Sequence, residues 1–478
     1  MSSSSSSSSS FPSRSVAAAT IVGAVLRLVR LGAEPLWLDE ATTASFAARD
    51  LRGALFAEPN HPPLFTLLEH AMTRLGGGGD AGLRLLPALC GILLVPATAS
   101  LAARLRLGRP AVVAWLIATA PLALAFAREA RAYALLALLL VLATRAFVDV
   151  TERRRGFVAY TICSILALHT HYLAAPALLA HDLALLATRT PRPPGLVRRW
   201  LAARAAVALA CVPWAIWVLG HVGTQARPWI GSPLVRVPYA ALRFAVGYGV
   251  APVHRALVDG GARAYLADAL PWLPCLLVIV AAWILGARTL ARAAAPSSRR
   301  LLVLLLAVPW AVVLALAPLV NLVHERYLAW QVAPLALLAA LAVDAVPRPR
   351  AALGVLVAAQ LACGLPLLVS GFRYGKEQWR DAAALVDGAA PALTLCAPGY
   401  LTLALDRYRH GAPCVPLTEG APVLPPLPRD AVIALVVGHG GPAEDALARD
   451  LAARHPVLVD RTLPAQLGIR VLVVRSDP

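Results

Sequence analysis

Two adjacent carboxylates, Asp39 and Glu40, follow the first long apolar stretch of this 478-residue sequence, within the segment Leu36-Trp37-Leu38-Asp39-Glu40. Ionised groups just past the end of a membrane helix are costly unless they are hydrated or paired, which makes a pure packing role a poor explanation. A carboxylate can take a proton from a hydroxyl group and accelerate a reaction by roughly 10² to 10⁴. Asp39 and Glu40 are therefore our candidates for catalytic residues.

Cations, histidines and tyrosines recur at points that the expected topology places on the same side of the membrane. The candidates for substrate or lipid-phosphate binding are His61, Arg128, Arg131, Tyr133, His171, Tyr172, Arg326 and Tyr327. Arg128 and Arg131 stand three residues apart, which predicts a shared helical face. Arginine offers bidentate donors to phosphate, and such donors stabilise the charge on a departing phosphate. An acid on one side and cations on the other suit the transfer of a group from a lipid phosphate.

Each of these signals also has an alternative explanation. Arginines near a membrane commonly extend to lipid headgroups, histidines such as His171 are often interfacial polar residues, and Glu325 and Arg326 are neighbours that can neutralise each other. Lys376 is the only lysine among 44 basic residues. We attribute it to codon bias and assign it no role in the mechanism.

Composition sets the broad class of the protein. The chain is 59% hydrophobic and 15% charged, whereas soluble domains carry roughly a quarter charged residues. The net charge of +18 comes from short basic clusters between apolar runs. Under the positive-inside rule such clusters mark cytoplasmic loops. We therefore expect an α-helical polytopic membrane protein in contact with membrane lipids, and no nucleic acid partner.

Helix length gives the topology, because crossing the hydrocarbon layer takes about 20 residues and the sequence holds about eleven such stretches. They lie near residues 16–31, 83–103, 110–127, 132–150, 157–171, 172–188, 201–219, 267–288, 301–320, 327–346 and 352–370. An odd number puts the amino terminus inside and the carboxyl terminus outside. We expect a disordered tail over 1–14, a membrane domain over 15–370, and an outer loop over 32–82. This loop holds a helix begun by Pro62 and Pro63 that is too short to cross.

The last part of the chain, residues 371–478, has a different pattern. Strand-like apolar runs and one helical stretch alternate there, which predicts a small extracytoplasmic α/β domain. The runs are Leu393–Cys396, Val432–Val437, Pro456–Val459 and Ile469–Val474, and the helix is Ala443–Arg454. Cys396 and Cys414 could pair in an oxidising compartment, although sequence alone leaves their pairing open. No CxxC or HExxH pattern is present, so we expect no metal site and no cofactor.

At this point the residues resemble a known family. The chain is similar to the GT-C superfamily of membrane glycosyltransferases, and most closely to bacterial members of glycosyltransferase family 39, relatives of protein O-mannosyltransferases and of the lipid A aminoarabinose transferase. The matching motifs are Leu38-Asp39-Glu40, His61-Pro62-Pro63-Leu64, Arg84-Leu85-Leu86-Pro87, Arg128-Glu129-Ala130-Arg131-Ala132-Tyr133, His169-Thr170-His171-Tyr172, Glu325-Arg326-Tyr327-Leu328 and Gln378-Trp379-Arg380. Their order along the chain makes the set more specific than any one motif.

The resemblance implies a role for individual residues. Asp39 falls where the family has the base that activates the acceptor, Glu40 would orient the loop or the acceptor, and Arg326 falls where the family holds the polyprenyl phosphate. His61 departs from the aminoarabinose transferases, which have a lysine before the two prolines.

The function that follows is hexosyl or pentosyl transfer from a polyprenyl-phosphate monosaccharide to a hydroxyl group of a lipid, glycan or protein. The reaction would invert the anomeric configuration and take place at the outer face of a bacterial inner membrane. The main alternative is a transporter or flippase of a lipid-linked sugar. Transporters usually show internal repeats and broken helices at the bilayer midplane, and the sequence shows no internal repeat.

Overall fold

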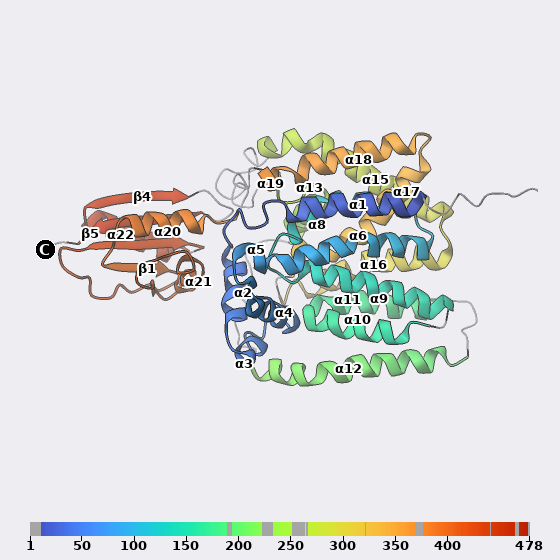
Figure 1. Cartoon of the computed structure of the whole chain (residues 1–478), viewed down its shortest axis with the longest axis horizontal. Coiled ribbons are helices and arrows are strands. Elements are labelled where there is room, and N and C mark those ends of the chain that lie inside the picture. The colour runs from blue at the N-terminus through green and yellow to red at the C-terminus, as the bar shows by residue number, and fades with distance from the viewer. Residues whose placement is uncertain are drawn as a thin grey trace, which may run out of the picture.

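A computed structural model describes residues 11–153, 155–188, 194–221, 233–250, 263, 266–320, 322–369, 376–439, 441–463 and 468–476. The serine run at residues 2–10, which forms most of the expected tail, lies outside the described residues. The described chain forms a helical bundle followed by a smaller domain with a β-sheet, which lies beyond one end of the bundle (Figure 1). The α-helical membrane architecture expected from the sequence is confirmed.

Within the part of the chain that the structure describes, seven helical segments are long and apolar enough to cross a membrane. They are Asp80–Leu105 (α5 and α6), Tyr133–Arg153 (α9), Leu196–His221 (α12), Leu266–Ala293 (including η3 and α15), Pro296–Leu316 (α16), Glu325–Ala345 (η4 and α17) and Pro349–Leu368 (α18 and most of α19). The other expected spans coincide with α1 (Phe11–Leu28), α7 (Pro110–Thr119) with α8 (Pro121–Phe126), α10 (Phe157–Thr170), and η2 with α11 (Tyr172–Leu186).

The loop after α1 carries α2 (Leu38–Ala48), α3 (Leu51–Leu55) and α4 (Leu64–Met72) across one end of the bundle, next to the C-terminal domain (Figure 1). We call this end of the bundle the site end. Helix α4 continues into a π-helical turn over Thr73–Gly77 and then reaches α5. It has 9 residues, and a helix of that length is too short to span a bilayer.

A break at Pro121 separates α7 from α8. Proline has no N–H, so the carbonyl of Ile117 loses its helical partner. The guanidinium of Arg27, on α1, donates to the carbonyls of Ile117 and Ala118 at 3.1 and 3.0 Å. This supplies the missing hydrogen bonds inside an apolar bundle, where unpaired backbone groups are costly.

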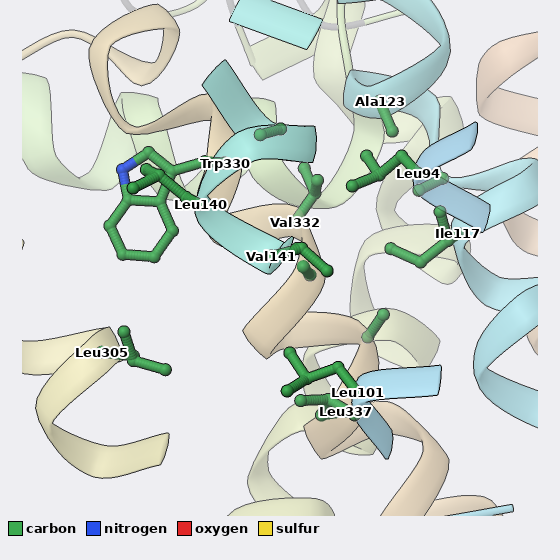
Figure 2. Packing of buried hydrophobic residues seen from close by; sticks show 14 of the residues in the cluster. Leu94, Leu101, Ile117, Ala123, Leu140, Val141, Leu305, Trp330, Val332 and Leu337 are labelled. Carbon is green, nitrogen blue, oxygen red and sulfur yellow. The ribbon is translucent and has the colours of Figure 1, made fainter. Parts of the chain in front are cut away.

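The apolar core lies among α6, α7, α9, α16 and α17. Figure 2 shows side chains from these helices converging, with Leu94 and Leu101 from α6, Leu140 from α9, and Trp330 from the helical turn η4 (Glu325–Gln331). Since η4 packs on α9, this core holds the residues at the start of η4 against the start of α9.

Helix α13 (Pro233–Val246) was not expected from the sequence. Its apolar residues alternate with Arg236, Tyr239 and Arg243, so it contains no run long enough to predict a span. It packs against α8, α15 and η4. The same helix therefore adds polar groups close to the residues of η4.

The C-terminal domain holds a five-stranded sheet with the order β2-β1-β3-β5-β4. Strand β1 is parallel to β2 and β3, whereas β5 is antiparallel to β3 and β4. The strands are Leu393–Ala397 (β1), Val415–Pro416 (β2), Val432–Gly438 (β3), Val457–Leu463 (β4) and Ile469–Arg475 (β5). The helices are Trp379–Gly388 (α20), Gly399–Leu401 (η5), Thr402–Leu405 (α21) and Pro442–Arg454 (α22). The expected strands are present, and Cys396 and Cys414 form a disulfide.

The C-terminal domain and α2 share one hydrophobic core. Leu36, Ala41 and Ala44 lie in the same buried cluster as Trp379 and Leu405. Because residues of the first loop and of the C-terminal domain exclude water together, the domain helps to fix the position of α2 at the site end.

Candidate active site

Glu40 lies in a sealed network of hydrogen bonds and ion pairs. Its side chain is 0% exposed, and its oxygens accept from Arg84 Nε and Nη2 at 2.8 and 2.7 Å. They also accept from Lys376 Nζ at 2.9 Å and from the backbone N–H of Ala130 at 2.8 Å. Burial alone would raise the pKa of Glu40, but Arg84 and Lys376 outweigh it and lower the pKa to about 2. Glu40 is therefore placed to fix structure.

Asp39, the preceding residue, has a different environment. Its side chain is 31% exposed, and Oδ2 lies 3.0 Å from Arg326 Nη1. Burial alone would raise the pKa of Asp39, but Arg131 and Arg326, followed by His61 and His439, lower it below its ordinary value. Asp39 is thus an ionised carboxylate that an external hydroxyl group can reach.

Arg326 connects Asp39, which it contacts, to a cavity that it also lines. Its guanidinium also lies over the ring of Trp37, 5.2 Å from the centroid. Several charged side chains from separate elements line the cavity together with Arg326: Arg30, Glu34, Arg84, Arg128, Glu129, Lys376 and Glu377. Five of these eight groups are cationic, which makes the cavity a candidate anion site.

Lys376 is the residue that sequence reasoning dismissed, and the structure places it in the site. Its ammonium lies between Glu40 and the carbonyl of Arg128, at 2.9 and 3.4 Å, and it lines the cavity. The signal was available in the sequence, because a single lysine stands among 44 basic residues just before the Gln378-Trp379-Arg380 motif. Its position beside Glu40 was not anticipated from the sequence.

The expected common face of Arg128 and Arg131 is also wrong. Residues 127–132 form turns between α8 and α9 and not a helix, so a spacing of three does not align side chains there. Arg128 Nη1 donates to the carbonyls of Arg27 and Val29 at the end of α1. Arg131 instead turns toward α2, where it donates to Thr43 Oγ1 at 3.1 Å.

Two histidines lie on the α2 side of Arg131. His61 Nε2 lies 3.1 Å from Arg131 Nη2, and its Nδ1 lies 2.8 Å from Glu58 Oε1. His171 Nδ1 accepts from the N–H of Leu173 at 3.1 Å. His61 therefore supports Arg131, and it is not among the residues that line the cavity.

Aromatic residues complete this side of the site. The ring of His171 lies 6.2 Å from that of Tyr133 and 5.6 Å from that of Tyr327. Tyr172 is further away, because its hydroxyl donates to the carbonyl of Pro59 and accepts from Trp214 Nε1. Tyr172 thus braces the first loop against α12 and does not face the cavity.

Glu325 does not neutralise Arg326, its neighbour in sequence. Glu325 Oε1 accepts from the hydroxyl of Tyr248 at 2.5 Å, and Oε2 lies 3.2 Å from His324 Nδ1. Arg326 is directed to Asp39 instead. Tyr248, which also lines the cavity, is a site residue that sequence reasoning missed, because it belongs to the segment after the unexpected helix α13.

Among the residues that the structure describes, no group of three or more histidine, cysteine, aspartate or glutamate side chains could hold a metal ion.

Comparison with known proteins gives one family match. The model of the family described as dolichyl-phosphate-mannose-protein mannosyltransferase matches residues 60–217, about a third of the chain. This range includes His61, Arg128, Arg131, Tyr133 and His171 but ends before Arg326. No curated sequence relative matches the chain.

Solved structures extend the likeness over nearly the full length. ArnT from Cupriavidus metallidurans bound to undecaprenyl phosphate aligns with 99% of this chain and 100% of its own, at a TM-score of 0.56 and 15% identity. The Archaeoglobus fulgidus oligosaccharyltransferase in complex with Zn and sulfate aligns with 83% of this chain and 61% of its own, at a TM-score of 0.50 and 16% identity. The archaeal oligosaccharyltransferase AglB from Archaeoglobus fulgidus, in complex with an inhibitory peptide and a dolichol-phosphate, aligns with 85% of this chain and 64% of its own, at a TM-score of 0.50 and 15% identity.

At such identities the structures show a shared fold, and the family model adds a sequence match within it. In this chain, Asp39 of the first loop lies beside Arg326 of η4. The chain is thus a multi-pass membrane protein with the fold of these solved structures, and residues 60–217 match the family described as dolichyl-phosphate-mannose-protein mannosyltransferase.

Proposed function

We propose that the protein transfers a hexosyl or pentosyl group from a polyprenyl-phosphate monosaccharide to an acceptor hydroxyl group, with Asp39 as the base. The observation that carries this proposal is the contact between Asp39 and Arg326. An accessible, ionised carboxylate touches a cation that also lines an anion-suited cavity. This is the pairing that proton removal and phosphate departure require.

The proposed reaction is a single displacement. The acceptor hydroxyl gives its proton to Asp39 while its oxygen forms a bond to the anomeric carbon. The bond between that carbon and the phosphate oxygen breaks, and its electron pair leaves with the lipid phosphate, next to Arg326. One displacement inverts the anomeric configuration. Arg128 and Lys376, on the cavity wall, lie where they can balance the charge of the phosphate.

Donor binding would strengthen the base. In the free protein, cations including Arg326 keep the pKa of Asp39 low, although burial opposes them. A low pKa makes the carboxylate a weak proton acceptor. A bound phosphate competes for Arg326 and adds negative charge nearby, which raises the pKa of Asp39 toward the range of an effective base. The arrangement would thus link base strength to the presence of the donor.

A separate apolar groove suits the lipid chain of such a donor. It is lined by Leu242, Val246, Val250, Leu266, Ala267, Ala269, Leu270, Trp272, Leu273 and Leu276. Tyr248 lies between two of these residues in sequence and lines the charged cavity. A polyprenyl phosphate could therefore place its phosphate near Arg326 and its tail along α15. Undecaprenyl phosphate and dolichol-phosphate in the similar structures support this choice of donor class.

The membrane orientation belongs to the same proposal. Arg104, Arg109 and Arg348 lie near helix ends opposite the site end, and the positive-inside rule would place that end in the cytoplasm. The Cys396–Cys414 disulfide in the C-terminal domain fits an oxidising compartment. The site would then face the outside of a bacterial inner membrane, where the acceptor is a lipid, a glycan or a protein.

The test uses purified protein in lipid nanodiscs with synthetic undecaprenyl-phosphate and decaprenyl-phosphate sugars. Candidate acceptors are lipid A precursors, cell-wall glycans and serine-containing or threonine-containing peptides, and mass spectrometry follows the free lipid phosphate and the glycosylated product. The expected result is release of lipid phosphate that depends on an acceptor and on Asp39. A protein that moved intact donor across a proteoliposome membrane, and released no lipid phosphate with any pair, would be a flippase.

A further inference from the structure

The C-terminal domain contributes one side chain to the surroundings of Asp39. His439 follows strand β3 directly and adopts a φ of 57°, in the left-handed region that residues other than glycine seldom occupy. Its side chain is only 13% exposed, and Nε2 lies 2.9 Å from Glu377 Oε1. His439 is also among the groups that lower the pKa of Asp39, after burial, which raises it, and the larger effects of Arg131 and Arg326.

Glu377 contacts both His439 and the helix that carries Asp39. Its second oxygen, Oε2, accepts from the backbone N–H of Leu38 at 2.9 Å and from Trp379 Nε1 at 3.2 Å. Leu38 is the first residue of α2 and the neighbour of Asp39. The first N–H groups of a helix have no partner within the helix, and a carboxylate there satisfies one of them and interacts favourably with the helix dipole. Glu377 thus caps α2 from a position 339 residues away in sequence.

A second side chain from the same domain holds the other flank of Trp37. The hydroxyl of Tyr408 accepts from the backbone N–H of Leu36 at 2.7 Å and donates to Asp80 at 2.7 Å. Side chains from the C-terminal region therefore fix the backbone on both sides of Trp37, immediately before Asp39. A firm hold is useful there, because a misplacement of about 1 Å at a reacting group can cost roughly 10²-fold in rate.

We propose that His439 is a positioning residue for transfer: by holding Glu377 in place, it fixes the first turn of α2 and keeps Asp39 in register with Arg326. This inference rests on the proposed function and extends it, because it makes the C-terminal domain part of the catalytic apparatus. His439 need not touch the substrate. Its contribution would appear in the rate of the chemical step and not in donor binding.

The kinetic test compares two substitutions that differ in reach. His439→Gln places an amide N–H about where Nε2 lies, and His439→Asn tolerates the left-handed backbone but ends short of Glu377. We expect His439→Asn to lower kcat by about 10-fold to 100-fold, with the donor KM within about twofold of the wild-type value, and His439→Gln to restore most of kcat. Arg409→Ala is the matched control, since it removes the buried Arg409 that pairs with Asp387 elsewhere in the domain.

A second measurement needs no substrate and so separates this inference from the proposed function. Hydrogen–deuterium exchange of a peptide covering Leu36–Thr43 reports the hold on the start of α2. We expect faster exchange there in His439→Asn and Glu377→Ala, and wild-type exchange in His439→Gln and Arg409→Ala. Unchanged exchange in His439→Asn would overturn the positioning role, as would an equal loss of kcat in Arg409→Ala. An inactive wild type with the expected exchange pattern would count against the proposed function alone.

Discussion

Asp39 and Glu40 are neighbours in sequence, yet they lie in two regions that differ in how far a carboxylate is buried and paired. Around Glu40, the protein provides Arg84, Lys376 and a backbone N–H, and the carboxylate is completely buried. Around Asp39, the carboxylate is partly exposed and shares Arg326 with an open cavity. The difference teaches that a conspicuous acidic pair need not act as a pair. The sealed region holds the loop in place, and the open region is where chemistry can occur.

The largest expected effect on transfer comes from Asp39→Asn. The substitution keeps the shape of the side chain and removes the proton acceptor, so kcat should fall by about 10² to 10⁴. The temperature of unfolding should change little, because the native side chain is 31% exposed. Steady-state release of lipid phosphate, together with thermal unfolding in the same detergent, checks both parts. Full activity in this variant would remove Asp39 from the mechanism.

Arg326→Ala should have the next largest effect, and on donor use in particular. Loss of a charge-assisted hydrogen bond is worth about 1.5 to 3 kcal/mol, which corresponds to a rise in the donor KM of roughly 10-fold to 150-fold. The KM for the acceptor should stay within a few fold. Kinetics with both substrates varied give the two constants separately. An unchanged donor KM would move the phosphate site away from Arg326, toward Arg128 and Lys376.

Glu40→Gln should affect stability more than transfer. The amide leaves Arg84 and Lys376 with buried charge that lacks a full partner, and breaking such a buried network costs about 3 to 5 kcal/mol. We expect a clear drop in the temperature of unfolding, with activity per folded molecule reduced less than in Asp39→Asn. An Asp39→Asn sample is the matched control, since it removes the neighbouring carboxylate. Equal stability of the two variants would break the distinction between the regions.

The pH dependence of stability also tests the structural role of Glu40. The pKa of Glu40 is lowered from 4.5 to about 2 in the folded protein. Its stabilising contribution should therefore be complete above pH 4.5 and should disappear as the pH falls toward 2. Thermal unfolding of the wild type across this window should show a decline that is smaller in Glu40→Gln. A parallel decline in both proteins would mean that other acids dominate.

The smallest expected effect belongs to His61→Gln. His61 accepts from Arg131 and is not among the residues lining the cavity, and an amide oxygen can also accept from Arg131. The donor KM should change by less than about threefold, which corresponds to about 0.7 kcal/mol, because glutamine keeps an acceptor for Arg131. A titration of donor concentration measures it. A much larger rise in KM would give His61 a direct part in phosphate binding.

The sequence predicted the features that depend on local pattern. Apolar stretches marked the spans, and alternating apolar runs marked the four longer strands of the C-terminal sheet. It also singled out Asp39 and Arg326, because charged residues at the ends of membrane helices stand out against an apolar background. Their contact across 287 residues was not derivable from spacing.

What the sequence did not reveal depends on tertiary position. Lys376, Glu377 and His439 reach the first loop only because the C-terminal domain packs on α2, a contact that no local pattern encodes. Arg128 and Arg131 were misjudged because residues 127–132 turn instead of forming a helix. Helix α13 was missed since its polar residues interrupt any apolar run.

The most direct test of the central claim measures donor binding and transfer on one sample of Asp39→Asn protein. In the wild type, Asp39 occupies Arg326 at 3.0 Å, so removing its charge should free Arg326 for the phosphate. The account predicts that Asp39→Asn binds a polyprenyl-phosphate sugar at least as tightly as the wild type, by fluorescence titration in nanodiscs, and transfers almost none of it to acceptor. Weaker donor binding with transfer close to the wild-type rate would contradict the account.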